Sequence, residues 1–255
     1  MTRKLRKHGT SGQALIITSL IIAVLLLSTT YYVFEMKRSV MKDVTTKSNS
    51  CLKAIRLSTT NTMISALANF TNGGEREVFI TDFNRLSSNI RKHYYEGECL
   101  LRFTPLNSSS YLNGTYTLCD QNGMGIASSY VSFVVNYSGL TEAYCWEFST
   151  NVTTTLILRS THTSNGTEKT VNVTCQMLNE NEPALMKDIA MFYQNESDGP
   201  WISTDSYSNV TTNDFGNGTY LISFIVQAQD FLQVSASAHD SRDVLVVANA
   251  TSTQV

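Results

Sequence analysis

The chain has 255 residues, of which 42% are hydrophobic and 16% charged, and its formal net charge is −2 with a pI near 6.1. This length predicts one domain or two, and the low charge leaves Ser, Thr and Asn to keep the surface soluble. Nucleic-acid binding usually shows as a basic patch or stripe. Basic residues cluster only at the start of the chain, so we expect no nucleic-acid partner. The clustered residues are Arg3, Lys4, Arg6 and Lys7.

A long apolar segment follows this basic cluster. No charged side chain occurs from Gly9 to Phe34, and residues 14–34 are mostly apolar. As a helix rising about 1.5 Å per residue, this run spans roughly 30 Å, the thickness of the hydrocarbon core of a bilayer. Its few hydroxyl side chains can bond back to helix carbonyls, so lipid tolerates them. The lipid bilayer is therefore the first partner that we expect.

The flanks of the apolar segment predict its orientation. Basic residues precede it, and Tyr31 and Tyr32 stand at its far end, where aromatic rings favour the membrane interface. We expect a single pass through the cell membrane, with a cytoplasmic leader at 1–12 and a transmembrane helix at 13–34. A cleaved secretory signal is the alternative, with Ser28 and Thr30 as the small residues before the cut. The run is longer than the roughly 7–15 residues of a typical signal core.

The junction between leader and helix carries a motif of its own. Basic residues, then Gly12-Gln13, then an unbroken apolar helix resemble the class III signal peptide of archaeal type IV pilins and archaellins. The resemblance implies that a prepilin peptidase cuts between Gly12 and Gln13. It also implies that the helix first anchors the subunit and later packs against like subunits in a filament. Ile17 stands where bacterial pilins usually carry a glutamate, which points to the archaeal branch.

Sequons of the form Asn-x-Ser/Thr are dense beyond the apolar segment. They start at 11 of the 20 asparagines, whereas chance placement of Ser and Thr would give about four or five. N-glycosylation needs an exported and exposed acceptor, so their placement favours an extracellular C-terminal region. A Ser/Thr/Asn-rich β protein that generates sequons by composition alone is the other explanation. The acceptors are Asn69, Asn107, Asn113, Asn136, Asn151, Asn165, Asn172, Asn195, Asn209, Asn217 and Asn249.

The five cysteines are typical of the same compartment. No two of them are spaced as Cys-x-x-Cys, so no zinc or thioredoxin-type site is indicated. Four cysteines allow three disulfide connectivities, and the spacing does not choose among them. Cys51 is the odd one, and it is free, linked to a neighbour, or a replacement for one member of the set. The four that suit two disulfides in an oxidising compartment are Cys99, Cys119, Cys145 and Cys175.

The region after the membrane segment predicts an α+β fold that begins with helices. Residues 35–97 contain apolar residues at helical spacing, and we expect extracellular membrane-proximal helices there. Asn72-Gly73-Gly74 predicts the end of the first helix, because glycine commonly caps a helix C-terminus. Asp82 is the expected N-cap of a short second helix.

From Cys99 onward the pattern changes to antiparallel β structure. Short runs rich in Val, Ile, Thr, Tyr and Phe alternate with glycine-containing turns. We expect a β-rich domain at 98–168 and a second β domain at 169–255. Residues 214–220, DFGNGTY, resemble the D-x-G-x-G-T-Y stretch of immunoglobulin-like and filamin-type repeats. The resemblance implies an immunoglobulin-like sandwich in which Tyr220 anchors a corner.

Motifs that carry chemistry are missing from the sequence. There is no G-x-S-x-G, P-loop or complete G-x-G-x-x-G, and the four histidines lack metal-ligand spacing. The acidic run NENE at 179–182 could weakly bind calcium, but a solvated turn is the more ordinary explanation. Trp146 and Trp201 could form a carbohydrate platform, although packing is the commoner role. We expect no enzymatic activity, no cofactor and no metal site.

These features favour a structural or adhesive protein over an enzyme. The first hypothesis is a pilin-like subunit of the archaeal cell surface with a glycosylated β ectodomain. The alternative is a single-pass type II surface glycoprotein that binds a ligand or partner through its β ectodomain. A membrane-tethered enzyme is the third possibility. The N-terminus of the mature chain distinguishes the first two.

Overall fold

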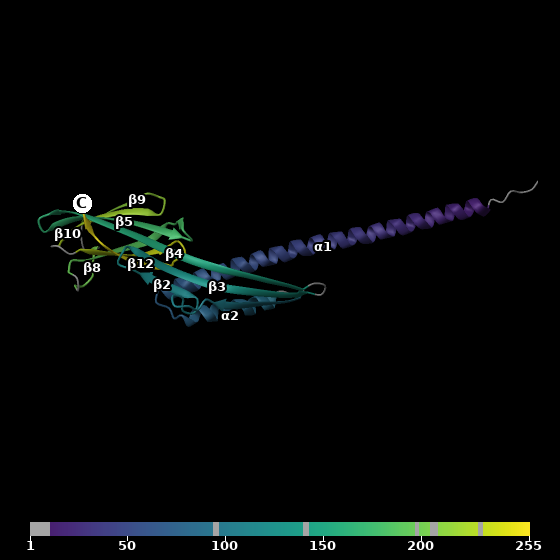
Figure 1. Cartoon of the computed structure of the whole chain (residues 1–255), viewed down its shortest axis with the longest axis horizontal. Helices are drawn as coiled ribbons and strands as arrows, with labels where there is room; N and C mark the ends of the chain where they lie inside the picture. The colour runs from purple at the N-terminus through teal and green to yellow at the C-terminus, as the bar shows by residue number, and fades with distance from the viewer. Residues whose placement is uncertain (1–10, 94–96, 140–142, 197–198, 205–208, 229–231) are drawn as a thin grey trace, which may run out of the picture. The chain divides into compact units, whose positions relative to one another are not determined.

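The computed structural model describes residues 11–93, 97–139, 143–196, 199–204, 209–228 and 232–255, with the backbone alone at 11–17 and 39–49. The fold is α+β, with helices first and mostly antiparallel sheets after them (Figure 1). By contacts, the chain divides into two compact units, residues 1–55 and 56–255. The helices are α1 (Ser11–Thr71) and α2 (Glu77–His93). The strands are β1 (Gly97–Pro105), β2 (Thr115–Cys119), β3 (Met124–Gly139), β4 (Ala143–Asn165), β5 (Glu168–Asn179), β6 (Glu182–Pro183), β7 (Met186–Gln194), β8 (Ile202–Ser203), β9 (Thr211–Asp214), β10 (Thr219–Gln227), β11 (Gln233–Asp240), β12 (Leu245–Thr251) and β13 (Thr253–Gln254).

α1 is a single helix of 61 residues that continues without a break through the expected boundary between residues 34 and 35. No proline or glycine occurs between Gln13 and Thr71 to interrupt it. It ends where the sequence predicts. Gly73 adopts a φ of 91°, the Asn72 amide donates to the Ala68 carbonyl, and the Gly74 amide donates to the Asn69 carbonyl. This is a glycine-capped helix terminus.

α2 begins at Glu77, five residues before the expected N-cap, so the start predicted from Asp82 is wrong. Asp82 lies inside the helix, where its carboxylate accepts a bond of 2.8 Å from Arg85 one turn later. The apolar face of α2 buries Phe79 and Phe83. Those two rings meet edge to face at 5.0 Å, and Phe83 also lies 5.4 Å from Phe133 of β3. α2 is therefore held to the sheet by an aromatic cluster.

The larger sheet has nine strands, six of them in the order β1-β3-β4-β5-β10-β9. β4 and β5 form a hairpin whose turn includes Gly166 with a φ of 66°. The boundary expected between residues 168 and 169 thus falls at the start of β5, and strands from both expected β domains share this sheet. A tight glycine turn at this point pairs the two strands directly instead of linking two separate domains.

The smaller sheet has the order β12-β11-β7-β8. β12 contacts β3 and β4, and β11 also contacts β4. Alternate residues are buried along β5, β10 and β12, as expected for strands with one face on a core. Tyr220 of β10 is buried, and its hydroxyl donates to the Met186 carbonyl of β7 at 3.3 Å. This bond joins the two sheets.

A buried polar network also joins the two sheets, at the turn between β11 and β12. The fully buried carboxylate of Asp240 accepts bonds from Thr154 of β4 and from Arg242 Nε at 2.8 Å. Arg242 Nη1 donates to both carboxylate oxygens of Glu180, in the β5–β6 turn. Burial alone would lower the pKa of Arg242, but its hydrogen bonds and the charges of Glu180 and Asp240 raise it. Arg242 stays charged and paired within this network.

Replacing Asp240 should therefore destabilise the β region strongly. Asp240→Ala leaves Arg242 partly buried without its main partner, and we expect a loss of about 3–5 kcal/mol in the free energy of unfolding. Urea unfolding of the full chain, followed by near-UV circular dichroism, measures this loss. Arg85→Ala breaks an exposed helix pair and should cost no more than about 1 kcal/mol. Equal effects of the two substitutions would contradict a special role for Asp240.

Candidate functional site

The segment Thr18–Arg38 of α1 is the most conspicuous candidate site. It is 21 residues long, has a mean hydropathy of 1.7, and none of it is buried within the protein. Its aliphatic and aromatic side chains point outward all round the helix, with Leu27 and Tyr31 more than 65% exposed. Apolar surface of this extent needs a covering, which lipid or other helices supply. By length and composition, the segment can act as a membrane span or a signal peptide.

The hydroxyl groups in this segment are satisfied inside the helix. Ser28 donates to the Leu25 carbonyl, Thr29 donates to the Leu26 carbonyl, and Thr30 donates to the same Leu26 carbonyl, each at 2.9 Å. The predicted back-bonding is confirmed at these three positions. The hydroxyls therefore leave no unpaired polar group to oppose burial in lipid.

The processing motif lies at the start of the same helix. Gly12 and Gln13 are in the first turn of α1, and their side chains are outside the described residues. The basic leader, including Arg3 and Lys7, also lies outside the described residues. Cleavage between Gly12 and Gln13 remains a prediction from the sequence.

The other end of α1 is fixed to the smaller sheet by side-chain hydrogen bonds. Asn72 Oδ1 and His239 Nε2 are 2.9 Å apart, and Asn72 Nδ2 donates to the Asp243 carbonyl at 3.0 Å. The Leu245 amide donates to Thr71 Oγ1. His239 therefore positions the helix end. It does not form a site with the neighbouring Asp240, whose carboxylate bonds Arg242. Sequence proximity alone had not revealed the helix contact.

The sequons lie on the β region and on the last turn of α1, and their exposure divides them into two groups. Seven acceptors are exposed: Asn69, Asn107, Asn113, Asn151, Asn165, Asn209 and Asn217. Four are half-buried: Asn136, Asn172, Asn195 and Asn249. Within the second group, Asn172 Oδ1 accepts a 2.7 Å bond from Ser223, and Asn249 Oδ1 is buried with no partner in the described residues. The exposed group is the better placed to carry glycans.

Strand register separates the four cysteines that were expected to form two disulfides. Cys99 lies opposite Tyr137 of β3, whereas Cys145 of β4 lies opposite Asn136. These two cysteines are two strands apart, at about 10 Å. Their offset of one residue also places them on opposite faces of the sheet. A disulfide needs Cα atoms within about 7 Å, so Cys99 and Cys145 do not reach each other.

The remaining pairings fail for the same reason. Cys175 of β5 lies opposite Leu158 of β4, which is 13 residues from Cys145 along the strand. Cys119 lies opposite Gly125 of β3, 12 residues from the partner of Cys99. Each residue advances a strand by about 3.3 Å, so these separations exceed 35 Å or so. Cys119 and Cys175 are three strands apart. None of the three connectivities fits this register.

Thiol labelling tests the cysteine arrangement. Cys119 and Cys145 are exposed, whereas Cys175 is buried and burial raises its pKa to about 12. We expect a maleimide to label Cys145 in the native full chain without prior reduction, and to label Cys175 only after denaturation. Mass spectrometry of the peptides measures both. A disulfide-linked Cys145–Cys175 peptide would contradict the register.

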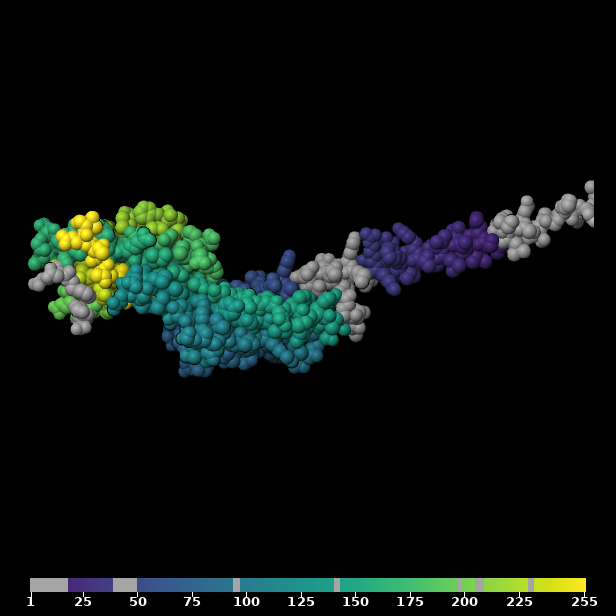
Figure 2. Space-filling model, viewed as in Figure 1, coloured from purple at the N-terminus to yellow at the C-terminus, as the bar shows by residue number. Residues whose placement is uncertain are grey.

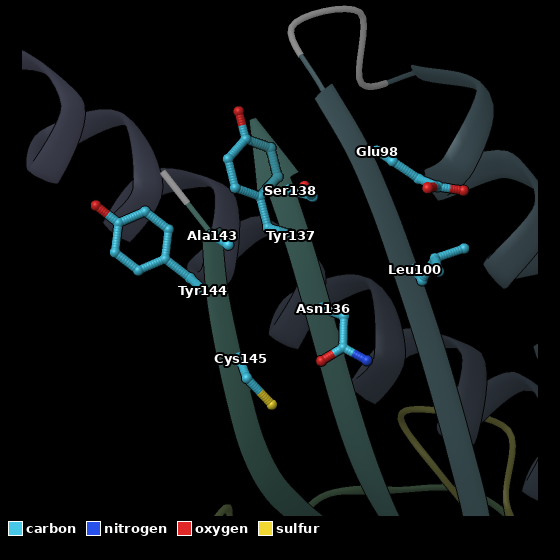
Figure 3. Close-up of a pocket in the computed structure, with 8 residues that line it drawn as sticks. All are labelled: Glu98, Leu100, Asn136, Tyr137, Ser138, Ala143, Tyr144 and Cys145. Carbon is cyan, nitrogen blue, oxygen red and sulfur yellow. The ribbon is translucent and has the colours of Figure 1, made fainter. Parts of the chain in front are cut away.

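A shallow hollow lies on the sheet where β1, β3 and β4 run side by side (Figure 3). Asn136, Leu100 and Cys145 come from these three neighbouring strands, and Tyr137 and Tyr144 stand at its rim. The rings of Tyr137, Tyr144 and Trp146 stack in a row, with centroids 6.4 Å and 5.5 Å apart. The only acid in the hollow is Glu98, which already pairs with Arg91. The hollow can therefore hold an apolar or sugar-like surface but contains no acid–base pair.

The described residues contain no cluster of His, Cys, Asp or Glu that could hold a metal ion. The NENE run at 179–182 forms the turn between β5 and β6, in which Glu180 and Asn181 adopt positive φ angles. Both carboxylate oxygens of Glu180 bond Arg242. This carboxylate is thus already used within the protein.

One buried histidine pair lies near the C-terminus. His162 Nδ1 and Ser252 Oγ share a hydrogen bond of 3.0 Å, and both residues are buried. Burial lowers the pKa of His162 below its usual value, and the positive charge of Lys169 adds to this effect. The neutral form of His162 therefore stabilises the junction between β4 and the C-terminal residues.

The lowered pKa of His162 predicts a pH dependence of stability. The unfolded chain binds a proton near pH 6.5, whereas the folded chain resists protonation. The contribution of His162 is present above pH 6.5 and is lost as pH falls below it. We expect the melting temperature of wild type to fall between pH 7.5 and pH 5.5 by more than that of His162→Gln. Equal falls in both proteins would contradict the assignment.

Comparison with known proteins adds no relative to these observations. No protein-family model matches the chain, and no curated protein is detectably similar to it. The functional argument therefore rests on the residues described above.

Proposed function

We propose that this chain is a membrane-anchored extracellular protein with a structural or adhesive role, a pilin-like subunit of the cell surface. The observation that carries the proposal is the fully exposed apolar segment Thr18–Arg38 at the start of α1. A helix that is apolar all round is stable in lipid or in the core of a helical assembly. The Gly12-Gln13 junction before it gives a route from one environment to the other, because prepilin-type cleavage keeps the helix in the mature chain.

The β region supports an extracellular position for residues 56–255. Seven sequons there or on the last turn of α1 present an exposed asparagine. The charged share of the sequence is low, and N-glycans would supply the missing hydrophilic surface. The orientation is then N-terminus cytoplasmic and C-terminal region extracellular, as the basic leader also favours.

The finer architecture of this proposal includes an immunoglobulin-like sandwich at the C-terminal end. Two packed antiparallel sheets and the bond from Tyr220 to the Met186 carbonyl support it. Strands β5 and β10 lie in the larger sheet, which also holds β1, β3 and β4. Such a sandwich would share its strands with the rest of the β region.

The aromatic row on β3 and β4 favours the alternative, a type II surface glycoprotein that binds a ligand. Tyr137, Tyr144 and Trp146 stack face to face beside the hollow in Figure 3. Stacked rings next to polar side chains are suited to sugars. In that alternative the N-terminus stays intact and the membrane helix is only an anchor.

The mature N-terminus decides between the two. We expect mass spectrometry of the chain from its native membrane to show a mature protein that begins at Gln13. Gly12→Leu should block the cut, leave a slower-migrating chain in the membrane and abolish surface filaments seen by electron microscopy. Gly9→Leu changes the other leader glycine and should be processed normally. An intact Met1 or Thr2 end in wild type would contradict prepilin processing and favour the alternative.

A further inference from the structure

One side of strand β4 has no partner strand over its first half. β3 pairs with β4 from Ala143 to Ile157, but β5 pairs with it only from Thr154 onward. No other described strand pairs on the β5 side of residues 143–153. In Figure 2 the teal strands β3 and β4 lie at one end of the unit 56–255, while the yellow C-terminal strands gather at the other. We call residues 143–153 of β4 the open edge.

The backbone of the open edge points its hydrogen-bonding groups outward at odd-numbered residues. The Thr153 carbonyl accepts a bond from the Glu180 amide on the β5 side, and the Thr153 amide donates to the Glu180 carboxylate. Pairing with β3 is regular from Ala143 to Thr153, so the alternation of the pleat continues. The amides and carbonyls of residues 143, 145, 147, 149 and 151 therefore face away from β3.

The sequence of the open edge carries few of the devices that prevent strand edges from pairing. Proteins usually protect an edge with lysine, proline, a bulge or a very short strand. The edge reads AYCWEFSTNVT, with no lysine or proline, and Glu147 is its only charge. Its aromatic and β-branched residues favour strand pairing. Such an edge is a template for an identical edge on a second copy of the chain.

Asn151 stands on this edge in a position suited to glycosylation. It is exposed and begins the sequon Asn151-Val152-Thr153. Its Oδ1 accepts bonds from Ser128 Oγ at 3.1 Å and from Thr153 Oγ1 at 3.2 Å. Its Nδ2, the atom that bears an N-glycan, makes no hydrogen bond to the described residues. The amide is thus oriented by two hydroxyls while its nitrogen faces solvent.

We propose that an N-glycan on Asn151 blocks the open edge of β4 and keeps it from pairing with the same edge of a second copy. The inference rests on the proposed extracellular location, because glycosylation needs export. A glycan here is bulky and hydrated, and its asparagine is one of the residues whose backbone faces outward. Any antiparallel partner strand that covers residue 151 must displace it. Anchoring in one membrane concentrates the copies and makes this protection necessary.

The other exposed sequons do not share this position. Asn165 is exposed in the turn between β4 and β5, where β5 already pairs with β4. Asn217 lies in the turn between β9 and β10, where its Oδ1 accepts the Thr219 amide. Asn165 is therefore a matched control, since it is an exposed sequon on the same strand but away from the open edge.

Amide hydrogen exchange of the full chain in membranes or detergent tests the proposal. We expect the peptide that covers residues 143–151 to exchange rapidly in glycosylated wild type, because its outward amides are unpaired. In Asn151→Gln the same peptide should exchange several-fold more slowly, and dilution should reverse this protection because it comes from a second copy. Thr153→Ala, which removes the sequon but keeps Asn151, should behave like Asn151→Gln.

Two further variants make the result specific. Asn165→Gln should exchange like wild type in the 143–151 peptide. Asn151→Gln combined with Ser149→Lys restores a charge to the edge and should recover rapid exchange. Unchanged exchange in both sequon variants would overturn the proposal, as would mass spectrometry that finds Asn151 unmodified in wild type. Glycans on other sequons in that second case would leave the proposed cell-surface function standing.

Discussion

The backbone hydrogen bonding of β4 is the constraint on which the rest of the β region depends. A strand in a sheet interior needs a partner on each side, and β4 is 23 residues long. β3 supplies one side from Ala143 to Ile157, and β5 supplies the other from Thr154 to Asn165. The two partnerships overlap for only four residues. This stagger extends the sheet into an arm at one end and leaves a large part of β4 with a single neighbour.

The face of β4 that carries its even-numbered residues is covered along most of its length. Between Val152 and His162 the even-numbered side chains are buried, as β11 and β12 pack against the strand. In the arm the same face meets aromatic and cationic groups, with Phe148 stacked on Phe133 and Arg56 lying 5.0 Å from the Phe148 ring. One strand thus contributes to two cores without changing its face, because the pleat alternation is never interrupted.

Local elements of this fold were predictable from the sequence, but their partners were not. The end of α1 follows from Asn72-Gly73-Gly74, and most strands follow from their composition, because these signals act over a few residues. The continuity of the sheet across residue 168 depends on a pairing that composition does not encode. The disulfides expected from cysteine number do not fit this register, since spacing in sequence gives no information on which strands are neighbours.

The polar contacts of the candidate sites were harder still to predict. Asp240 bonds Thr154 across 86 positions, and His239 bonds Asn72 across 167. Asp240 and Arg242 two residues apart in a turn were the only local signal for the first network, and such a pair is common at exposed turns. The apolar segment was easier, because a membrane span is specified by consecutive residues. Signals confined to one stretch of chain were therefore read correctly, and contacts between stretches were missed.

The scarcity of charge links the surface of the β region to its sequons. A protein with 16% charged residues has little electrostatic repulsion to keep identical edges apart, and exposed hydroxyls do not repel each other. Glycans provide the same protection sterically, and salt does not screen steric exclusion as it screens charge. A surface protected in this way would keep its copies separate at high ionic strength. The density of exposed sequons on a weakly charged β surface is then a physical substitute for lysine and glutamate at strand edges.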